Sequence, residues 1–239
     1  ARPDGNAVES LSLNAAATTA ASGAGLTVNY AASTGILSIT GSATVATYQT
    51  ILRGIQYSNT SDAPTTSSRL VTVVANDGSS PSAAATSTVT VAAVNDAPVN
   101  TVPGAQSTNE DTALVFSAGN SNAISIADDA GASSVQVALS GTNGVITLAG
   151  TAGLTFSVGD GTADGAMTFT GTVSAINAAL DGLSFAPTAN FSGAASLSIT
   201  TNDQGNTGTG GAKSDTDAVA ITVTAVNDAP VADLNAGGA

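Results

Sequence analysis

The chain has 239 residues, no cysteine, no histidine and a formal net charge of −13, from 17 acidic and four basic side chains. Four basic residues cannot neutralise a phosphate backbone, so nucleic acid is not an expected partner, and no apolar run reaches the ~20 residues of a membrane span. The missing cysteines and histidines exclude disulfides, thiolate metal sites and the usual general base. We therefore expect no enzyme activity and no small-molecule substrate.

Alternating apolar and polar residues predict strands in several places along the chain. The clearest of these lie at residues 70–73, 88–91, 135–139, 197–200 and 220–223. Clusters of Gly, Asn, Asp, Ser and Pro separate them at short spacing. This organisation predicts an all-β fold of the sandwich type.

Two segments, residues 41–57 and 171–185, break the alternation. Apolar residues at i, i+3 and i+7 give each a helical face: Val45, Tyr48 and Leu52 in the first, and Val173, Ile176 and Leu180 in the second. Each segment is predicted to form one short helix, capped by Ser or Thr and ended by Gly, followed by a strand. The scarce aromatic side chains are expected to fill the core; they are Tyr48, Tyr57, Phe169 and Phe185.

Two short acidic segments are assigned to loops. Residues 159–165 combine Gly and Asp and predict a hairpin turn, because a nonapeptide calcium roll needs stacked copies and this pattern occurs once. Residues 215–217 read Asp-Thr-Asp before a strand and predict a solvated loop.

The hexapeptide Val-Asn-Asp-Ala-Pro-Val occurs twice, beginning at Val94 and at Val226, 132 residues apart. Each copy follows a predicted strand, and its proline ends the sheet ladder. The spacing matches the size of one domain, so the hexapeptide marks the boundary of a tandem repeat. Asn95 and Asp96 within it either supply oxygen ligands or form an Asx-turn before the proline.

The motifs around the hexapeptide resemble the cadherin-like tandem repeats of large bacterial surface adhesins, many of them type I secreted RTX adhesins. They are Ala-Asn-Asp-Gly at 75–78 with Val-Thr-Val at 89–91, Thr-Asn-Asp-Gln-Gly at 201–205, and Asn-Glu-Asp-Thr at 109–112. The resemblance implies cadherin- or immunoglobulin-like β-sandwich repeats, each with one short helix. Residues 1–99 would be a repeat lacking its first strand, 100–231 a complete repeat, and 232–239 the start of another.

In cadherins, calcium lies between consecutive repeats. The resemblance assigns the central joint to two linker residues, two loop residues and one residue that follows a strand: Asn95, Asp96, Asp128, Asp129 and Asp203. It assigns three further residues, Glu110, Asn227 and Asp228, to the next joint, and Asp77 to an earlier one. Ca²⁺ takes six to eight oxygen ligands, and carboxylates, amides and carbonyls of this kind supply them.

The resemblance implies a structural extension segment of an extracellular bacterial adhesin, at the cell surface or secreted. Its partners would be neighbouring repeats of the same chain, and Ca²⁺ would stiffen each joint. Two alternatives stay open. One is a self-assembling surface filament or layer, in which copies of the chain complete one another by strand addition; the other is a calcium-dependent carbohydrate-binding module.

Overall fold

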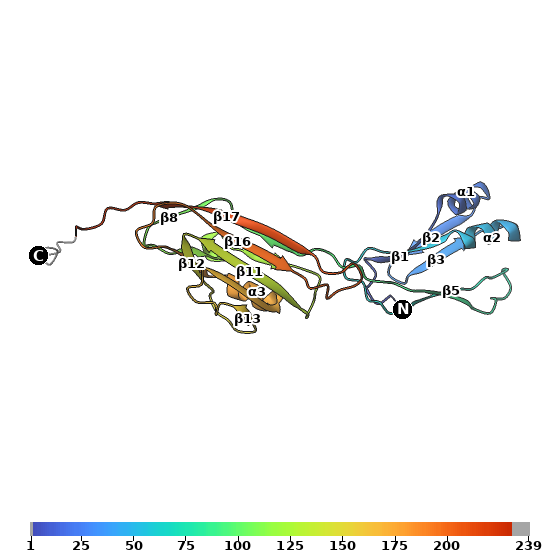
Figure 1. Ribbon diagram of the computed structural model, residues 1–239. Coiled ribbons are helices and arrows are strands. Elements are labelled where there is room, and N and C mark those ends of the chain that lie inside the picture. The colour runs from blue at the N-terminus through green and yellow to red at the C-terminus, as the bar shows by residue number, and fades with distance from the viewer. Residues whose placement is uncertain (1, 231–239) are drawn as a thin grey trace, which may run out of the picture. The chain divides into compact units, whose positions relative to one another are not determined.

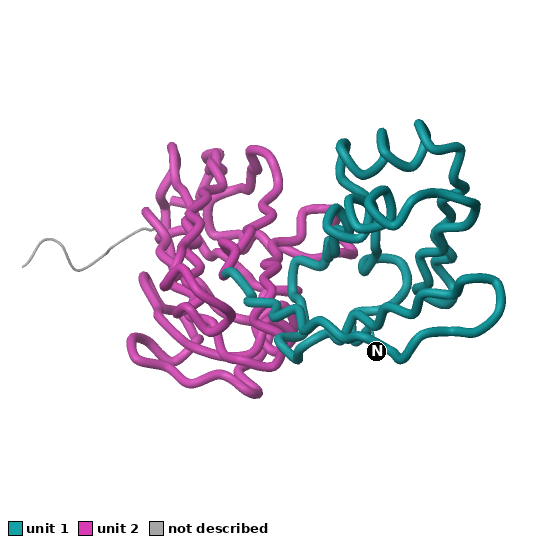
Figure 2. Tube along the Cα trace, turned by 90° about the vertical axis from the view of Figure 1, so that its right-hand side faces the viewer, with its two compact units in different colours: residues 1–94 teal, residues 95–239 magenta. Residues whose placement is uncertain are grey.

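A computed structural model describes residues 2–230, which fall into two compact units (Figure 2). Unit 1 is Ala1–Val94 and unit 2 is Asn95–Ala239. The division lies inside the first hexapeptide, so Asn95 and Asp96 belong to unit 2. The predicted start of a further repeat, residues 232–239, lies outside the described residues.

Strands predominate in both units, which confirms the all-β class (Figure 1). Unit 1 contains β1 (Glu9–Leu13), α1 (Ala15–Gly23), β2 (Thr27–Ala31), β3 (Ile36–Thr40), α2 (Val45–Arg53), β4 (Ile55–Asn59), β5 (Arg69–Val73) and β6 (Ala85–Val89). Unit 2 begins with β7 (Val99–Thr101), β8 (Gln106–Asn109), β9 (Leu114–Phe116), a 3-10 turn η1 (Ala118–Asn120), β10 (Ser125–Ala127) and β11 (Ser134–Thr142). It continues with β12 (Gly144–Thr147), β13 (Thr155–Val158), β14 (Ala166–Thr172), α3 (Val173–Leu180), β15 (Leu183–Pro187), β16 (Gly193–Asn202) and β17 (Ser214–Thr224).

Unit 2 is built on a six-stranded sheet of order β13-β14-β11-β16-β17-β8, in which only the β17–β8 pairing is parallel. A three-stranded sheet, β12-β15-β9, and the pair β10-β7 complete it. Alternate side chains of both larger sheets share one core, which includes Val137 of β11, Phe169 of β14 and Phe185 of β15. Strand alternation places these residues on one face, as the sequence predicts.

The two predicted helices are present and capped as expected. Thr44 and Thr172 are the N-caps of α2 and α3, and each side chain accepts a hydrogen bond from a backbone N–H in the first turn. Asn177 on α3 then fastens the helix to β10, because its side chain accepts from the N–H of Ile126 at 2.8 Å and donates to the carbonyl of Ile126 at 2.9 Å. The strands that follow the helices, β4 and β15, also match the prediction.

The two acidic segments assigned to loops differ in outcome. Residues 159–165 join the antiparallel strands β13 and β14, and the Asp164 side chain accepts from the N–H groups of Asp160 and Gly161, which confirms the hairpin. Residues 215–217, predicted as a solvated loop, instead lie in β17. Asp215 accepts a hydrogen bond from the Asn100 N–H at 2.7 Å, so this carboxylate links β7 to β17.

Unit 1 consists of three separate two-stranded ladders, β1-β4, β2-β3 and β5-β6. Its buried apolar cluster contains four residues, Ala17, Ala21, Leu26 and Ile51, against twenty-two in the core of unit 2. Burial of apolar area is the main driving force of folding, so the two units differ greatly in the stabilisation that their cores provide.

Unit 1 contains a second helix, α1, so the prediction of one short helix in each repeat is wrong for this unit. Asn14 caps α1 by accepting from the Ala17 N–H at 2.9 Å, and the alanines that follow favour the helix strongly. Helix α1 carries no amphipathic stripe of large apolar residues. Only Ala17 and Ala21 are buried, and the close approach of Gly54 to Ala17 leaves no room for a side chain at position 54.

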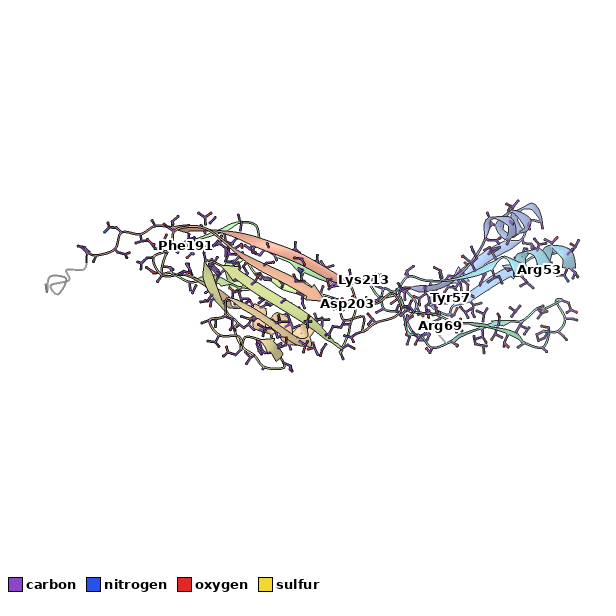
Figure 3. The ribbon with its side chains drawn as sticks, viewed as in Figure 1. Arg53, Tyr57, Arg69, Phe191, Asp203 and Lys213 are labelled. Carbon is purple, nitrogen blue, oxygen red and sulfur yellow. The ribbon has the colours of Figure 1, made fainter. Side chains whose placement is uncertain are left out.

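A buried polar cluster holds the β1-β4 ladder to the start of β5 (Figure 3). The guanidinium of Arg69 pairs with Glu9 at 2.7 Å and with Asp4, and the Tyr57 hydroxyl donates to Glu9 at 2.8 Å. Hydrogen bonds from Thr65 are the largest cause that lowers the pKa of Asp4, to about 2, and Asn59 and Arg69 add to it. Tyr57 was expected only to fill the core, and its hydroxyl instead takes part in this cluster.

Candidate metal centre

Asn95, the first residue of unit 2, is fully buried and fixed by contacts from both its backbone and its side chain. Its side-chain nitrogen donates to Asp203 Oδ2 at 2.7 Å and to the Gly211 carbonyl at 2.9 Å. Its backbone N–H donates to the Thr209 carbonyl at 2.8 Å. Asn95 therefore does not form the Asx-turn that the sequence left open, because its side chain bonds to a loop more than 100 residues away.

Asp203 begins the loop between β16 and β17 and is also fully buried. Burial works to raise the pKa of its carboxyl, but hydrogen bonds from the N–H groups of Lys213 and Gly205 and from the Asn95 amide outweigh burial and hold the pKa below its ordinary value. These bonds measure 2.8, 2.7 and 2.7 Å. Asp203 is thus ionised and positioned in the folded protein.

The predicted pair Asp128 and Asp129 follows β10 and lies beside this cluster. Asp128 Oδ1 accepts from the Ala130 N–H at 2.8 Å, whereas its Oδ2 is buried without a hydrogen-bond partner. Burial raises the pKa of Asp128, and the nearby carboxylates of Asp129, Asp203 and Asp96 raise it further. An unpaired buried carboxylate oxygen among like charges is a feature that a bound cation would satisfy.

The Thr207 hydroxyl links the linker to the acidic loop. Its Oγ1 lies 2.9 Å from Asn95 Oδ1 and 2.7 Å from Asp129 Oδ1. A hydroxyl has one proton to donate, so at any moment one of these two oxygens faces Thr207 without a shared hydrogen. The orientation of the Asn95 amide is fixed by its donor bonds to Asp203 and Gly211, which leaves Oδ1 facing the Thr207 hydroxyl.

The side chain of Lys213 is the one cationic group that contacts this cluster among the described residues. Lys213 is the single lysine of the chain, and its ammonium donates to the backbone carbonyl of Asn95 at 2.5 Å. Figure 3 shows Asp203 and Lys213 close together at one end of the six-stranded sheet. Lys213 therefore supplies one positive charge beside a group of four carboxylates, namely those of Asp96, Asp128, Asp129 and Asp203.

The structure brings all five residues predicted for the central joint into one neighbourhood. Asn95, Asp129 and Asp203 are connected by hydrogen bonds, and the carboxylates of Asp96 and Asp128 interact electrostatically, although Asp96 is exposed. Across residues 2–230, however, no three acidic, histidine or cysteine side chains converge closely enough to hold a metal. A calcium ion here would need amide, carbonyl, hydroxyl and water oxygens beside the carboxylates, a mixture that Ca²⁺ accepts.

The three residues predicted for the next joint, Glu110, Asn227 and Asp228, are not all connected by hydrogen bonds between their side chains. Glu110 follows β8 and is buried, and its Oε1 accepts from the Val226 N–H at 2.6 Å, one residue before Asn227. Asn227 and Asp228 are exposed, and the Asn227 side chain donates to the Asp228 carbonyl at 3.2 Å. Glu110 is thus placed beside the second hexapeptide through the backbone.

Asp77 occupies in unit 1 the sequence position that Asp203 occupies in unit 2. It is exposed, and hydrogen bonds from the N–H groups of Ser80 and Ser79 lower its pKa. Those bonds, at 3.0 and 2.8 Å, close a turn within its own loop. The same motif therefore forms a buried network in unit 2 and an exposed turn in unit 1.

Two residues of the cluster were not predicted from the sequence, Thr207 and Lys213. Thr207 lies in a Gly- and Thr-rich loop with no pattern that distinguishes it. Lys213 carried a signal, because it is the single lysine and stands ten residues after Asp203.

Comparison with known proteins adds no assignment: no protein-family model matches this chain, and no curated protein matches it. Within residues 2–230, no helix is both long enough and apolar enough to cross a bilayer.

Proposed function

We propose that this chain is an extension segment of an extracellular bacterial adhesin, made of cadherin-like β-sandwich repeats in which Ca²⁺ restrains the linker hexapeptide. The ion would bind among Asn95, Asp96, Asp128, Asp129 and Asp203, with no more than two of the carboxylates in direct contact and amide, carbonyl, hydroxyl and water oxygens as the other ligands. In this proposal the chain acts mechanically: fixing the linker to unit 2 limits bending between consecutive repeats and keeps a distal binding region away from the surface.

One observation above all supports the proposal. The linker residue Asn95 is fully buried against Asp203, 108 positions away in sequence. Asp203 in turn interacts electrostatically with Asp128, one of whose oxygens is buried without a hydrogen-bond partner. A linker that only connected two repeats would not need the Asn95 side-chain amide to be buried and hydrogen-bonded to the Asp203 carboxylate. Cation binding would satisfy Asp128 Oδ2 and reduce the repulsion among the four neighbouring carboxylates.

Bound calcium should also stabilise unit 2. A ligand that binds only the folded state stabilises it by about 2.7 kcal/mol at one hundred times its dissociation constant. Chelation is therefore expected to lower the melting temperature of unit 2, and in the proposed mechanism it also increases bending at the linker.

Calorimetric titration of the full chain with Ca²⁺ tests the site. Asp128→Asn is expected to weaken binding at least tenfold, whereas Asp62→Asn, an exposed change of the same chemistry in unit 1, leaves binding unchanged. Small-angle scattering with and without chelator tests the mechanical role through the maximum particle dimension. If titration to millimolar Ca²⁺ gives no binding heat, the proposed calcium site is wrong. If Ca²⁺ binds but chelator does not change the maximum particle dimension, the proposed stiffening is wrong.

A further inference from the structure

The elements of unit 1 from β1 to β6, apart from α1, match elements of unit 2 in order and register. Aligning Tyr57 with Phe185 pairs β1-β4 with β12-β15: Leu11 lies opposite Tyr57, as Ile146 lies opposite Phe185. Aligning Asp77 with Asp203 pairs β5-β6 with β16-β17: Val71 lies opposite Ser87, as Leu197 lies opposite Val219. Aligning Gly41 with Gly171 pairs β2-β3 with β13-β14: Val28 lies opposite Ile39, as Phe156 lies opposite Phe169.

The corresponding sheets differ in one strand. In unit 2, β11 lies between β14 and β16 and pairs antiparallel with both, which joins the two hairpins into one sheet. In unit 1 the hairpins β2-β3 and β5-β6 are separate sheets, and among the described residues of this unit no strand pairs with the second edge of β3 or of β5. Those two edges are the ones that β11 covers in unit 2.

Side chains beside these edges are less covered than their counterparts. Leu37 and Ile39 of β3 and Val71 and Val73 of β5 are only partly buried. Their counterparts Met167, Phe169, Leu197 and Ile199 are all buried, at 1% exposure or less. Unpaired strand edges flanked by apolar side chains are where β-strand addition occurs.

We propose that unit 1 binds an extended polypeptide segment between β3 and β5, antiparallel to both, with the side-chain pattern of β11. Its inward positions would carry Val or Leu at every second residue, and its outward positions would be small or polar. The occupant is a segment from outside these 239 residues. No described strand of a second copy of the chain has both edges free to supply it, because β11 is held between two strands and every other described strand is paired with at least one neighbour.

The register in unit 2 fixes the expected register of the occupant. Leu139 of β11 lies opposite both Met167 and Ile199, so its equivalent would lie opposite Leu37 and Val73. The equivalent of Val137 would lie opposite Ile39. The segment would end before Arg69, where Asp4 and Glu9 already occupy the guanidinium. This inference is independent of calcium.

A synthetic peptide with the sequence of residues 132–143 tests the inference on the full chain, with hydrogen exchange read by mass spectrometry. Peptide is expected to slow amide exchange at least tenfold in β3 and β5 and to leave β14 and β16 unchanged. A peptide with Leu139→Lys, whose side chain points inward, should bind at least tenfold more weakly, whereas Ser140→Lys, which points outward, should bind like the parent.

Changes in the protein provide the reciprocal test. Val73→Lys on the inner face of β5 is expected to abolish peptide protection, and Leu70→Lys on its exposed outer face to preserve it. No slowing at millimolar peptide, equal binding of the two lysine peptides, or protection confined to β14 and β16 would each overturn the inference. Concentration-dependent dimerisation of the chain that protects β5 without peptide would also overturn it, because it would identify a second copy as the occupant.

Discussion

Units 1 and 2 share the same helix-strand-hairpin sequence pattern, yet only unit 2 assembles it around a large core. In unit 2, β11 joins two hairpins, and the buried side chains of both sheets form one cluster. In unit 1 the same hairpins stay separate, and the buried apolar cluster is confined to helix α1, Leu26 and Ile51. Equivalent residues therefore contribute differently to stability, because burial depends on the strand that joins the hairpins rather than on the residues themselves.

Unit 1 has a polar cluster where unit 2 has small residues. In the alignment of the two units, Arg69 corresponds to Ala195 and Glu9 to Gly144. A buried ion pair contributes little net stability, but removal of one partner leaves an uncompensated buried charge. Unit 1 therefore depends on a few polar contacts, whereas unit 2 depends on many apolar ones.

The largest difference between the units is expected from a matched pair of core truncations. Phe169→Ala should destabilise unit 2 by about 4 kcal/mol, because it removes a fully buried ring and leaves a cavity. The equivalent change Ile39→Ala should cost unit 1 about 1 kcal/mol, because Ile39 is only partly buried. Denaturant unfolding followed by hydrogen exchange in each unit measures both values, and equal losses would contradict the comparison of the cores.

Loss of Arg69 should destabilise unit 1 selectively. Arg69→Ala removes the partner of Glu9 and Asp4 and is expected to cost about 3 kcal/mol, since it leaves Glu9 buried with no compensating charge. Arg53→Ala, on the exposed side of α2, is the matched control and should change the free energy of unfolding little. Similar melting of the two variants would show that the polar cluster does not hold unit 1 together.

The two equivalent aspartates, Asp203 in unit 2 and Asp77 in unit 1, should differ less in their contributions to stability. Asp203→Asn is expected to cost unit 2 about 2 kcal/mol, because charge-assisted bonds from Gly205 and Lys213 are weakened in a buried site. The pKa of Asp203 is lowered, so its contribution is present above pH 3.8 and is lost as the pH falls through the lowered pKa. Asp77→Asn, an exposed substitution, should change the free energy of unfolding of unit 1 much less in the same measurement.

In the absence of metal, substitution of Asp128 should change the stability of unit 2 in the direction opposite to substitution of Asp203. Its pKa is raised, so its favourable contribution is present below pH 3.8 and is lost as the pH rises through the raised value. Asp128→Asn is therefore expected to stabilise metal-free unit 2 at pH 7 by about 1 kcal/mol, the lower end of the cost of an unsatisfied buried group. Thermal unfolding in chelator measures this gain, and a loss of stability instead would show that the carboxylate is already compensated within the protein.

Acid titration provides the finest test of unit 1. The pKa of Asp4 is lowered to about 2, so its stabilising contribution is complete above pH 3.8 and is lost as the pH falls toward 2. The difference in unfolding temperature between the wild type and Asp4→Asn is thus expected to be greatest above pH 3.8, to shrink as the pH falls through about 2 and to vanish at lower pH. A difference that stays constant across this range would mean that the ionised carboxylate is not what stabilises unit 1.

Local sequence signals were sufficient for the all-β class, for helices α2 and α3 and for the strands that follow them. Threonine caps, apolar residues at helical spacing and strand alternation act over a few residues and leave a direct trace in the chain. The same reasoning missed α1, whose buried alanines carry no amphipathic stripe, and placed Asp215 in a loop although it lies in β17.

The sequence by itself determined which residue types repeat and where the oxygen-bearing side chains lie along the chain. Only the tertiary structure decided which of these side chains contact one another. In unit 2, Asn95 is buried against Asp203, and Thr207 and Lys213 bond to Asn95. In unit 1, Arg69 pairs with both Asp4 and Glu9. These contacts join positions far apart in sequence, and no local periodicity encodes which distant loop a side chain will reach. Packing then decides what each motif becomes, because the same aspartate motif is an exposed turn in unit 1 and a buried network in unit 2.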